Sequence, residues 1–460
     1  MRLIFLFLSV LLLSFSSNAQ EVVEGNLLAQ WNKDGIPGSF TYDNAYNEIW
    51  GLAVNGYEYA VIGSSLGTHF IDVTDTDDVY EAFFVEGRAA GGAIIHRDYH
   101  DNDGYLYAVS DEGNSSLQII DVRSLPDSIS VVYDEDDLIR TSHNIFIDED
   151  NDRLYSCAHR GFVTGNSALR VLDISDPLNP VDILGTNTFE NFGVGHVHDA
   201  YVKDNIGYLN CGRDGFALVD FTDIDSLQLL GFLEPDDYPD SGYNHSGWLS
   251  EQEDIYYMAD EDHGRAIKTI DVTDYTELET VSTFDEGMNI SNSIPHNLIV
   301  QGDYLYVSYY YNGLQVYDIQ DRENPKRIMH YPTSSIPNGN SYEGAWGVYP
   351  FLPSGNILVS DMQEGLFVVE GVSSIVSNNE VVAEVFTIYP NPVTDFIQIQ
   401  LEEEGNYDYR IKNISGQVIQ KGEINSLKSS LTIEAIPSGT YFIELNNEKQ
   451  IFAQKFVVTK

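Results

Sequence analysis

A short run that reads Leu-x-Val-x-Asp-Val, or close to it, occurs seven times in the chain at intervals of about 50 residues. Each copy places an acid at the same point of the run, and these acids are Asp72, Asp121, Asp173, Asp220, Asp271, Asp318 and Glu370. A fixed period of this length indicates one supersecondary unit that is copied along the chain and needs its neighbours to cover its apolar faces. The repeat therefore constrains the architecture far more than it constrains the chemistry.

The unit that begins at His296 shows what each copy builds. Residues 296–332 contain four runs rich in β-branched and aromatic residues, HNLIV, YLYVSY, GLQVYDI and KRIMHYP, separated by turn residues. Alternating apolar residues between Gly, Asn, Asp and Pro are typical of strands joined by tight turns. Four strands in a unit of about 40–50 residues predict one blade of a β-propeller. Seven units therefore predict an all-β, seven-bladed propeller over residues 20–371.

The seventh unit supplies only three strands before the repeat stops at Glu370. A ring of blades has to join its first and last members without leaving open strand edges. A strand-like run at residues 26–32, NLLAQWN, precedes the first unit and matches the outermost-strand position of the other units. We expect this N-terminal strand to complete blade seven.

Both ends of the chain carry sequences outside the repeat. Residues 1–19 combine one Arg with an apolar run and a small-x-small cleavage pattern, which predicts a secretory signal peptide. Residues 372–383 have the composition of a linker, and residues 384–460 hold seven further strand-like runs that predict a small β-sandwich. No later segment is long and apolar enough to predict a transmembrane helix.

The chain is strongly acidic, with 72 Asp and Glu against 23 Lys and Arg and a formal net charge of −49. Because phosphate binding depends on Lys and Arg, this charge argues against nucleic acid and anionic lipid as partners. It is compatible with simple solubility and with cation collection on an acidic surface. The two cysteines, Cys157 and Cys211, are expected to be buried thiols rather than a disulfide.

A His or Trp opens each unit, and these markers are Trp50, His96, His143, His198, His245, His296 and Trp346. The innermost strand of a blade begins at one face, called the top, and the loop between the second and third strands returns to that face. We therefore expect the markers to surround the top of the central channel. The polar residues expected beside them are Asp111, Arg160, Arg213, Asp214 and Tyr310. Convergent polar groups around a concavity predict a ligand site.

A metal is one candidate ligand, because imidazole suits Zn²⁺ and other transition metals. The residues proposed for it are His198, His245, His296, Glu261 and Asp262. Ca²⁺ is the other divalent candidate, at the acidic turns 101–105, 148–152 and 260–264, although Asp, Asn and Gly are common in turns of every kind. The histidines could instead brace neighbouring blades. No GxSxG or phosphate-binding glycine motif is found, so no catalytic residue is predicted.

The C-terminal segment resembles a known family. The runs that carry the resemblance are IYPNPVTDFIQIQL (388–401), ISGQVI (414–419), SGTYFIEL (438–445) and KFVVTK (455–460). They closely resemble the C-terminal sorting domain of the type IX secretion system of Bacteroidetes. The resemblance implies that the type IX machinery exports the chain, which is then released or attached at the cell surface.

The repeats also resemble a family. The Leu-x-x-x-Asp runs and residues 96–122 look like the LVIVD repeats of choice-of-anchor B proteins. That resemblance implies an extracellular propeller and carries no catalytic motif. Three functions therefore stay open: a binding module for a glycan, peptide or protein at the top face, a metal-dependent hydrolase or lyase that uses the same face, and a structural surface protein.

Overall fold

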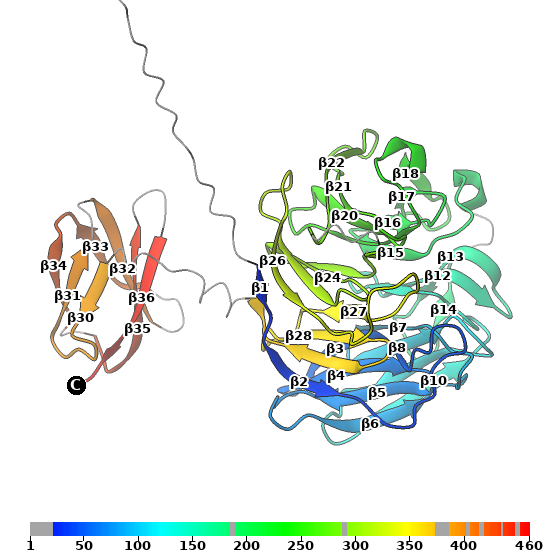
Figure 1. Ribbon diagram of the computed structural model, residues 1–460, viewed down its shortest axis with the longest axis horizontal. Coiled ribbons are helices and arrows are strands. Elements are labelled where there is room, and N and C mark those ends of the chain that lie inside the picture. The colour runs from blue at the N-terminus through cyan, green and yellow to red at the C-terminus, as the bar shows by residue number, and fades with distance from the viewer. Residues whose placement is uncertain are drawn as a thin grey trace, which may run out of the picture. The chain divides into compact units, whose positions relative to one another are not determined.

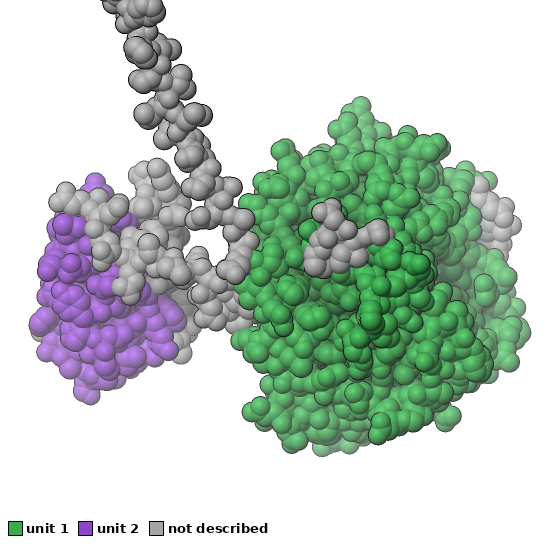
Figure 2. Space-filling model, viewed as in Figure 1, with its two compact units in different colours: residues 1–375 green, residues 376–460 purple. Residues whose placement is uncertain are grey.

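The protein forms two compact units, residues 1–375 and 376–460, which are coloured separately in Figure 2. The computed structural model describes residues 22–184, 189–287, 292–372, 386–401, 405–413, 418–433, 436–446 and 451–460. The signal peptide predicted at residues 1–19 and residues 373–383 of the predicted linker lie outside these ranges.

Seven sheets build the larger unit (Figure 1). The first three sheets are β3 (Tyr46–Val54), β4 (Tyr57–Ser64), β5 (Gly67–Asp72) and β6 (Tyr80–Glu86); β7 (Arg97–Asn102), β8 (Tyr105–Ser110), β9 (Leu117–Asp121) and β10 (Ser130–Glu135); and β11 (Ile145–Asp148), β12 (Arg153–Gly161), β13 (Gly165–Asp173) and β14 (Val181–Asp182). The next two are β15 (Asp199–Lys203), β16 (Ile206–Asn210), β17 (Phe216–Asp220) and β18 (Gln228–Leu233); and β19 (Asn244–Leu249), β20 (Ile255–Asp260), β21 (Ile267–Asp271) and β22 (Glu279–Phe284).

The last two sheets recruit strands from the N-terminal segment. The sixth contains β23 (Leu298–Gln301), β24 (Tyr304–Ser308), β25 (Leu314–Asp318), β26 (Lys326–Tyr331) and β1 (Val23–Glu24), and the seventh contains β27 (Ala345–Tyr349), β28 (Ile357–Asp361), β29 (Gly365–Val369) and β2 (Leu27–Trp31). The strand expected at residues 26–32 is thus β2, which pairs antiparallel with β29 and is the outermost strand of its sheet. The parallel pairing of β1 with β26 was not expected from the sequence.

The first strands of the sheets close a ring. They contact one another in the order β3, β7, β11, β15, β19, β23 and β27, and β27 contacts β3 again. The all-β, seven-bladed propeller predicted from the repeat is therefore confirmed. The two short 3₁₀ turns, η1 (Phe189–Phe192) and η2 (Pro235–Asp237), lie between strands.

Local sequence explains why the chain reverses where it does. In the turns Asn55–Gly56, Asp103–Gly104 and Asp204–Asn205 both residues have positive φ, as a two-residue hairpin turn of type I′ requires. Asp103 and Gly104 have φ values of 46° and 78°, and only Gly, Asn and Asp adopt this region readily. Turn chemistry thus explains Asp103, whereas Asp101 lies in β7 and accepts a hydrogen bond from Trp50 Nε1 at 2.7 Å.

The aspartate of the repeat has a structural use. In six copies its Oδ1 accepts a hydrogen bond of 2.8–3.0 Å from the backbone N–H two residues later, and the donors are Thr74, Arg123, Ser175, Thr222, Thr273 and Gln320. This is an Asx turn, which satisfies a backbone donor where the third strand ends. Cys157 and Cys211 are buried free thiols, as expected.

The smaller unit is a β-sandwich. One sheet contains β30 (Phe386–Tyr389), β31 (Phe396–Leu401) and β34 (Lys428–Thr432), and the other contains β33 (Val418–Ile424), β32 (Tyr407–Asn413), β35 (Gly439–Asn446) and β36 (Ile451–Val458). Buried side chains such as Ile397, Ile411 and Ile443 fill the space between the two sheets. Within the described ranges, no helix has the length and apolar character needed to cross a membrane.

Candidate functional site

Six aromatic side chains encircle the channel at one end of the inner strands. We call His96, His143, His198, His245, His296 and Trp346 the His ring. Successive ring centroids are 4.8, 4.1, 4.1, 4.4 and 4.8 Å apart, and Trp346 closes the ring at 5.2 Å from His96. The repeat thus brings together residues that lie about 50 positions apart in the sequence, as we expected for six of the seven markers.

Trp50 is the exception, and its assignment to the top of the channel is wrong. A bulge between Tyr46 and Ile49 shifts the register of β3, so that Asn47 holds the marker position of the first blade. Trp50 lies three residues further along the strand, which is about 10 Å deeper in the channel. Its ring contacts His100 and Tyr349 there, with centroid distances of 4.5 and 5.0 Å.

Four of the five ring histidines make a hydrogen bond through Nδ1, whereas the Nδ1 atom of His245 has no hydrogen-bond partner among the described residues. His143 donates from Nδ1 to Asp111 Oδ2 at 2.9 Å, His198 to the His245 carbonyl at 3.0 Å, and His296 to the Trp346 carbonyl at 2.5 Å. The Nδ1 atom of His96 contacts the carboxylate of Glu112. The bonds of His143, His198 and His296 join neighbouring blades, whereas the contact of His96 stays within its own blade, so the expected bracing role has a structural basis for three of the histidines.

The ring is mostly uncharged at neutral pH. Burial lowers the pKa of His198 and of His245 well below the ordinary value, and it lowers the pKa of His296 to about 3. In His96 burial also lowers the pKa, but the Glu112 carboxylate outweighs it and the pKa is raised. Burial raises the pKa of Glu261, beside His245 and His296, to about 7, although the Tyr310 hydroxyl donates to this carboxylate at 2.5 Å.

A cavity of about 710 Å³ opens above the His ring. Its wall includes tyrosines and arginines, namely Tyr42, Tyr243, Tyr310, Tyr342, Arg160 and Arg213, together with the carboxylates of Asp111, Glu261 and Asp262. Arg213 is paired with Asp262 through two bonds of 2.6 and 3.0 Å, whereas Arg160 is exposed and makes no ion pair with any described residue. Asp214 does not line the cavity, because its Oδ2 accepts a bond from the Gly195 backbone.

A layer of buried carboxyl groups lies below the ring. Glu48 accepts bonds from Asn297 Nδ2 at 2.6 Å and from the Ile49 backbone, and Asp98 accepts from the Ile145 backbone at 2.6 Å. Burial raises the pKa of Glu48 to about 7, of Asp199 to about 8, and of Asp98 well above its usual range.

Aromatic side chains fill the channel below this carboxyl layer. We call Trp50, His100, Phe146, Tyr201, Trp248, Tyr349 and Phe351 the lower collar. Their neighbouring centroids lie 4.5–6.4 Å apart. The space beside the carboxyl layer is about 60 Å³, against about 710 Å³ for the cavity above the His ring.

Three groups of side chains in and around the ring could hold a metal ion. They are His143 with His198 and His245, His96 with Asp111 and His143, and His245 with Glu261 and His296, and within each group the ligand atoms lie within 4.8 Å of one another. The residues proposed for a metal from the sequence included His198, His245, His296 and Glu261, and the structure adds His143, His96 and Asp111 to the candidates.

The acidic turn at residues 260–264 does not form a calcium loop. Asp260 is buried and bonds Lys268 Nζ at 2.7 Å, Asp262 pairs with Arg213, and Glu261 accepts from Tyr310. Because each carboxylate has a different partner, their oxygens do not converge as Ca²⁺ ligands do. Asp262 is for the same reason not in any of the metal-binding groups.

Some residues of the site were not found by sequence reasoning. Tyr42 and Tyr342 precede inner strands within loops of no regular pattern, and no signal points to them. The carboxyl layer has a signal that could have been read, because a polar residue follows the marker in several units, as in His143–Asn144, His198–Asp199 and His296–Asn297.

Comparison with known structures agrees with the propeller. The structure of U3-55K superposes with a TM-score of 0.50 at 9% identity, covering 73% of this chain and 97% of that one, which supports the fold alone. PorZ of Porphyromonas gingivalis, an essential bacterial surface component of the type-IX secretion system, matches with a TM-score of 0.45 at 12% identity. That alignment covers 93% of this chain but 61% of PorZ. The extracellular domain of the putative one component system BT4673 from B. thetaiotaomicron matches with a TM-score of 0.46 at 12% identity, covering 95% of this chain and 60% of that one.

A family model matches the smaller unit. Residues 387–459 match the secretion system C-terminal sorting domain. The chain is therefore a type IX export substrate that interacts with that machinery and reaches the cell surface or the medium. A search of curated proteins gave no match for the chain.

Proposed function

We propose that this protein is an exported β-propeller that binds an extracellular ligand in the cavity above the His ring. The observation that carries the proposal is the cavity wall, which presents four tyrosines and an arginine without an ion-pair partner among the described residues, in a chain that has 72 acids and 23 bases. A concave site lined by aromatic rings with a few polar groups is where ligands bind.

The tyrosines and Arg160 of the cavity wall support a particular class of ligand. Tyr342 stands among Tyr42 and Tyr310 at centroid distances of 5.9 and 5.5 Å, and such rings stack on flat or apolar faces. Arg160 is available to an anionic group because no carboxylate of the described residues pairs with it. Acidic glycans and acidic peptides or protein segments share this chemistry.

Binding of the full chain to an array of glycans and acidic peptides tests the proposal. Arg160→Gln should weaken binding tenfold or more, because a hydrogen bond to a charged group contributes about 1.5–3 kcal/mol. Tyr342→Ala should weaken it too, while Tyr80→Ala, an exposed tyrosine on β6, should not. Binding that survives both cavity substitutions would place the ligand elsewhere and refute the proposal.

We propose that the propeller belongs with the LVIVD-repeat propellers of choice-of-anchor B proteins, supported by the seven repeats and by the Asx turns that their aspartates make. Metal-dependent hydrolysis or elimination at the same cavity is the second candidate function. The grouping of imidazoles at the cavity floor favours it over a purely structural surface protein.

A further inference from the structure

Four ring histidines bond a partner through Nδ1 and leave Nε2 free, and His245 has no hydrogen-bond partner among the described residues on either ring nitrogen. Carboxylates and carbonyl oxygens only accept, so the Nδ1 atoms bonded to Asp111, Glu112 and the two backbone carbonyls carry the ring proton. In a neutral imidazole the other nitrogen, Nε2, then presents a lone pair. Among the described residues no hydrogen bond reaches Nε2 of these rings, and Glu261 stays 3.7–3.8 Å from Nε2 of His245 and His296.

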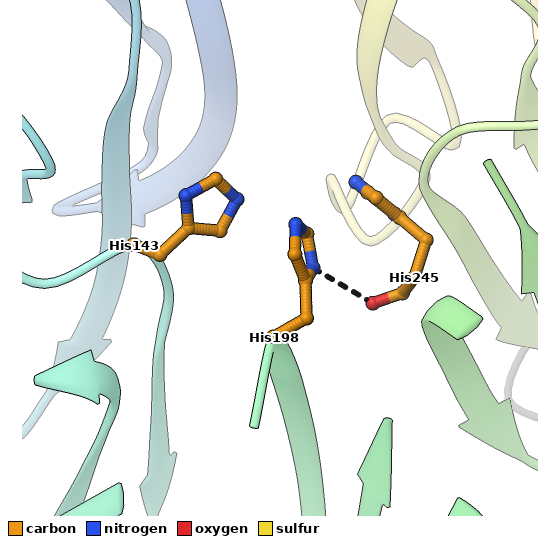
Figure 3. A group of neighbouring side chains, drawn as sticks. All are labelled: His143, His198 and His245. Carbon is orange, nitrogen blue, oxygen red and sulfur yellow. Dashed lines mark hydrogen bonds between the residues drawn. The ribbon is translucent and has the colours of Figure 1, made fainter. Parts of the chain in front are cut away.

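This pattern is the one that metal-binding histidines show. Such a histidine donates its second ring N–H to a carboxylate or backbone carbonyl, which fixes the tautomer and the ring orientation. The bonds of His143 to Asp111 and of His198 to the His245 carbonyl are of this kind. Figure 3 shows the rings of His143 and His245 on either side of His198, with the bond from His198 to the His245 carbonyl dashed.

Bracing of the blades does not by itself explain the imidazoles. In the first blade Asn47 holds the marker position, and its amide donates to the Ile95 carbonyl of the next blade at 2.9 Å. An amide therefore makes the same kind of bond between blades. The histidines supply a feature that bracing does not use, namely Nε2 atoms that no hydrogen bond from a described residue reaches.

We propose that His143, His198 and His245 bind one transition-metal ion through Nε2 at the floor of the cavity. Their ligand atoms already lie within 4.8 Å of one another, and four-coordinate Zn²⁺ with bonds of about 2.0–2.1 Å needs them at about 3.4 Å. Imidazole ligands select Zn²⁺, Co²⁺, Ni²⁺ or Cu²⁺ over Ca²⁺ and Mg²⁺.

The surroundings suit a cation with an open position. The carboxylates of Asp111, Glu112 and Glu261 stand against the ring and offset the charge of the ion. Three protein ligands leave a fourth position, which faces the cavity and could hold water or a donor atom of the ligand. The inference deepens the proposed function and rests on it, because the metal would form part of the same ligand site.

Metal titration of the full, untagged chain tests the site. The protein is stripped with a chelator and titrated with Co²⁺ and with Zn²⁺, following heat and the visible absorption of Co²⁺. Wild type should bind one equivalent of metal with the spectrum of a four-coordinate ion. His198→Gln should abolish the spectrum or weaken binding by more than tenfold, and Asp111→Asn, which replaces the carboxylate acceptor of His143 Nδ1 by an amide and removes its charge, should weaken it about tenfold to a hundredfold.

The matched control is His100→Gln. His100 is equally buried on an inner strand but lies in the lower collar against Trp50, so its loss should leave metal binding unchanged. Tryptophan fluorescence verifies that each variant is folded. Absence of saturable Co²⁺ and Zn²⁺ binding by wild type, or binding that His198→Gln and His100→Gln affect equally, would overturn the inference.

Failure of this inference can be separated from failure of the proposed function. The array is repeated with chelator-treated protein and with metal-loaded protein. Ligand binding that depends on Tyr342 but occurs without any metal site would refute the metal alone. Metal binding that depends on His198 without any array ligand would refute the proposed function and leave the metal site in place.

Discussion

Replacing Glu48 by Gln should remove a pH-dependent loss of stability from the propeller. Burial raises the pKa of Glu48 from 4.5 to about 7, so the folded protein holds this proton more tightly than the unfolded chain does. Folding stability is then complete below about pH 4.5 and falls as the pH rises toward 7. Gln stays neutral throughout, so the variant escapes this fall.

The magnitude follows from the two pKa values. The full difference corresponds to ~3 kcal/mol at 1.36 kcal/mol per pKa unit. Between pH 5 and pH 8 the free energy of unfolding of the variant should rise relative to wild type by ~2.5 kcal/mol. The charge of Glu48 also raises the pKa of Asp98, so Glu48→Gln should lower the pKa of Asp98 as well.

Urea denaturation at the two pH values measures this difference. All tryptophans of the chain, Trp31, Trp50, Trp248 and Trp346, lie in the larger unit, so their fluorescence reports on the propeller. Exposed Glu277→Gln removes the same charge without burial and serves as the control. If the difference between Glu48→Gln and wild type is the same at pH 5 and pH 8, Glu48 is ionised in the folded protein and the reasoning is wrong.

Three further perturbations test the fold. Deleting residues 22–32 removes β1 and β2 and exposes the edges of β26 and β29, so the protein should aggregate or melt earlier; a monomer with unchanged melting temperature would contradict this. Ending the chain at residue 372 should leave tryptophan-detected unfolding unchanged, because the smaller unit has its own core, and an insoluble product would show otherwise. Lys268→Met leaves the buried carboxylate of Asp260 without its ion-pair partner and should lower the free energy of unfolding, measured by urea denaturation, by about 3–5 kcal/mol. Arg322→Met, at the exposed ion pair with Asp254, should lower it by under about 1 kcal/mol.

The architecture could be predicted because local and global signals agree in every unit. Alternating apolar residues, Asx turns at Asp72 and its equivalents, and hairpin turns such as Asp103–Gly104 all specify the same four strands. The period then places the markers around one axis, which is why five histidines distant in the sequence were correctly grouped. The two-residue strand β1 has no such signal, since its pairing with β26 depends on the finished sixth sheet.

The details of the site depended on features that a pattern does not record. Trp50 matched the marker as an aromatic residue, but the bulge at residues 46–49 gave that position to Asn47. Asp262 pairs with Arg213 of the preceding blade and does not belong to a metal-binding group, which the sequence pattern did not predict. Tyr42 and Tyr342 entered the cavity wall through loops, whose course follows from tertiary packing rather than from local sequence.

The pairing of β2 with β29 has a consequence for the order in which the blades of the propeller can assemble. Leu27 and Val369 are partners in this sheet although roughly 340 residues separate them, so the N-terminal strand has no partner until nearly the whole propeller has been made. The first six sheets draw their four consecutive strands from neighbouring chain and can assemble as they emerge. A nascent chain whose synthesis stops before residue 365 would have an unpaired N-terminal strand and an open ring. Such a chain exposes strand edges to proteases and chaperones before the sorting domain at residues 387–459 has been made.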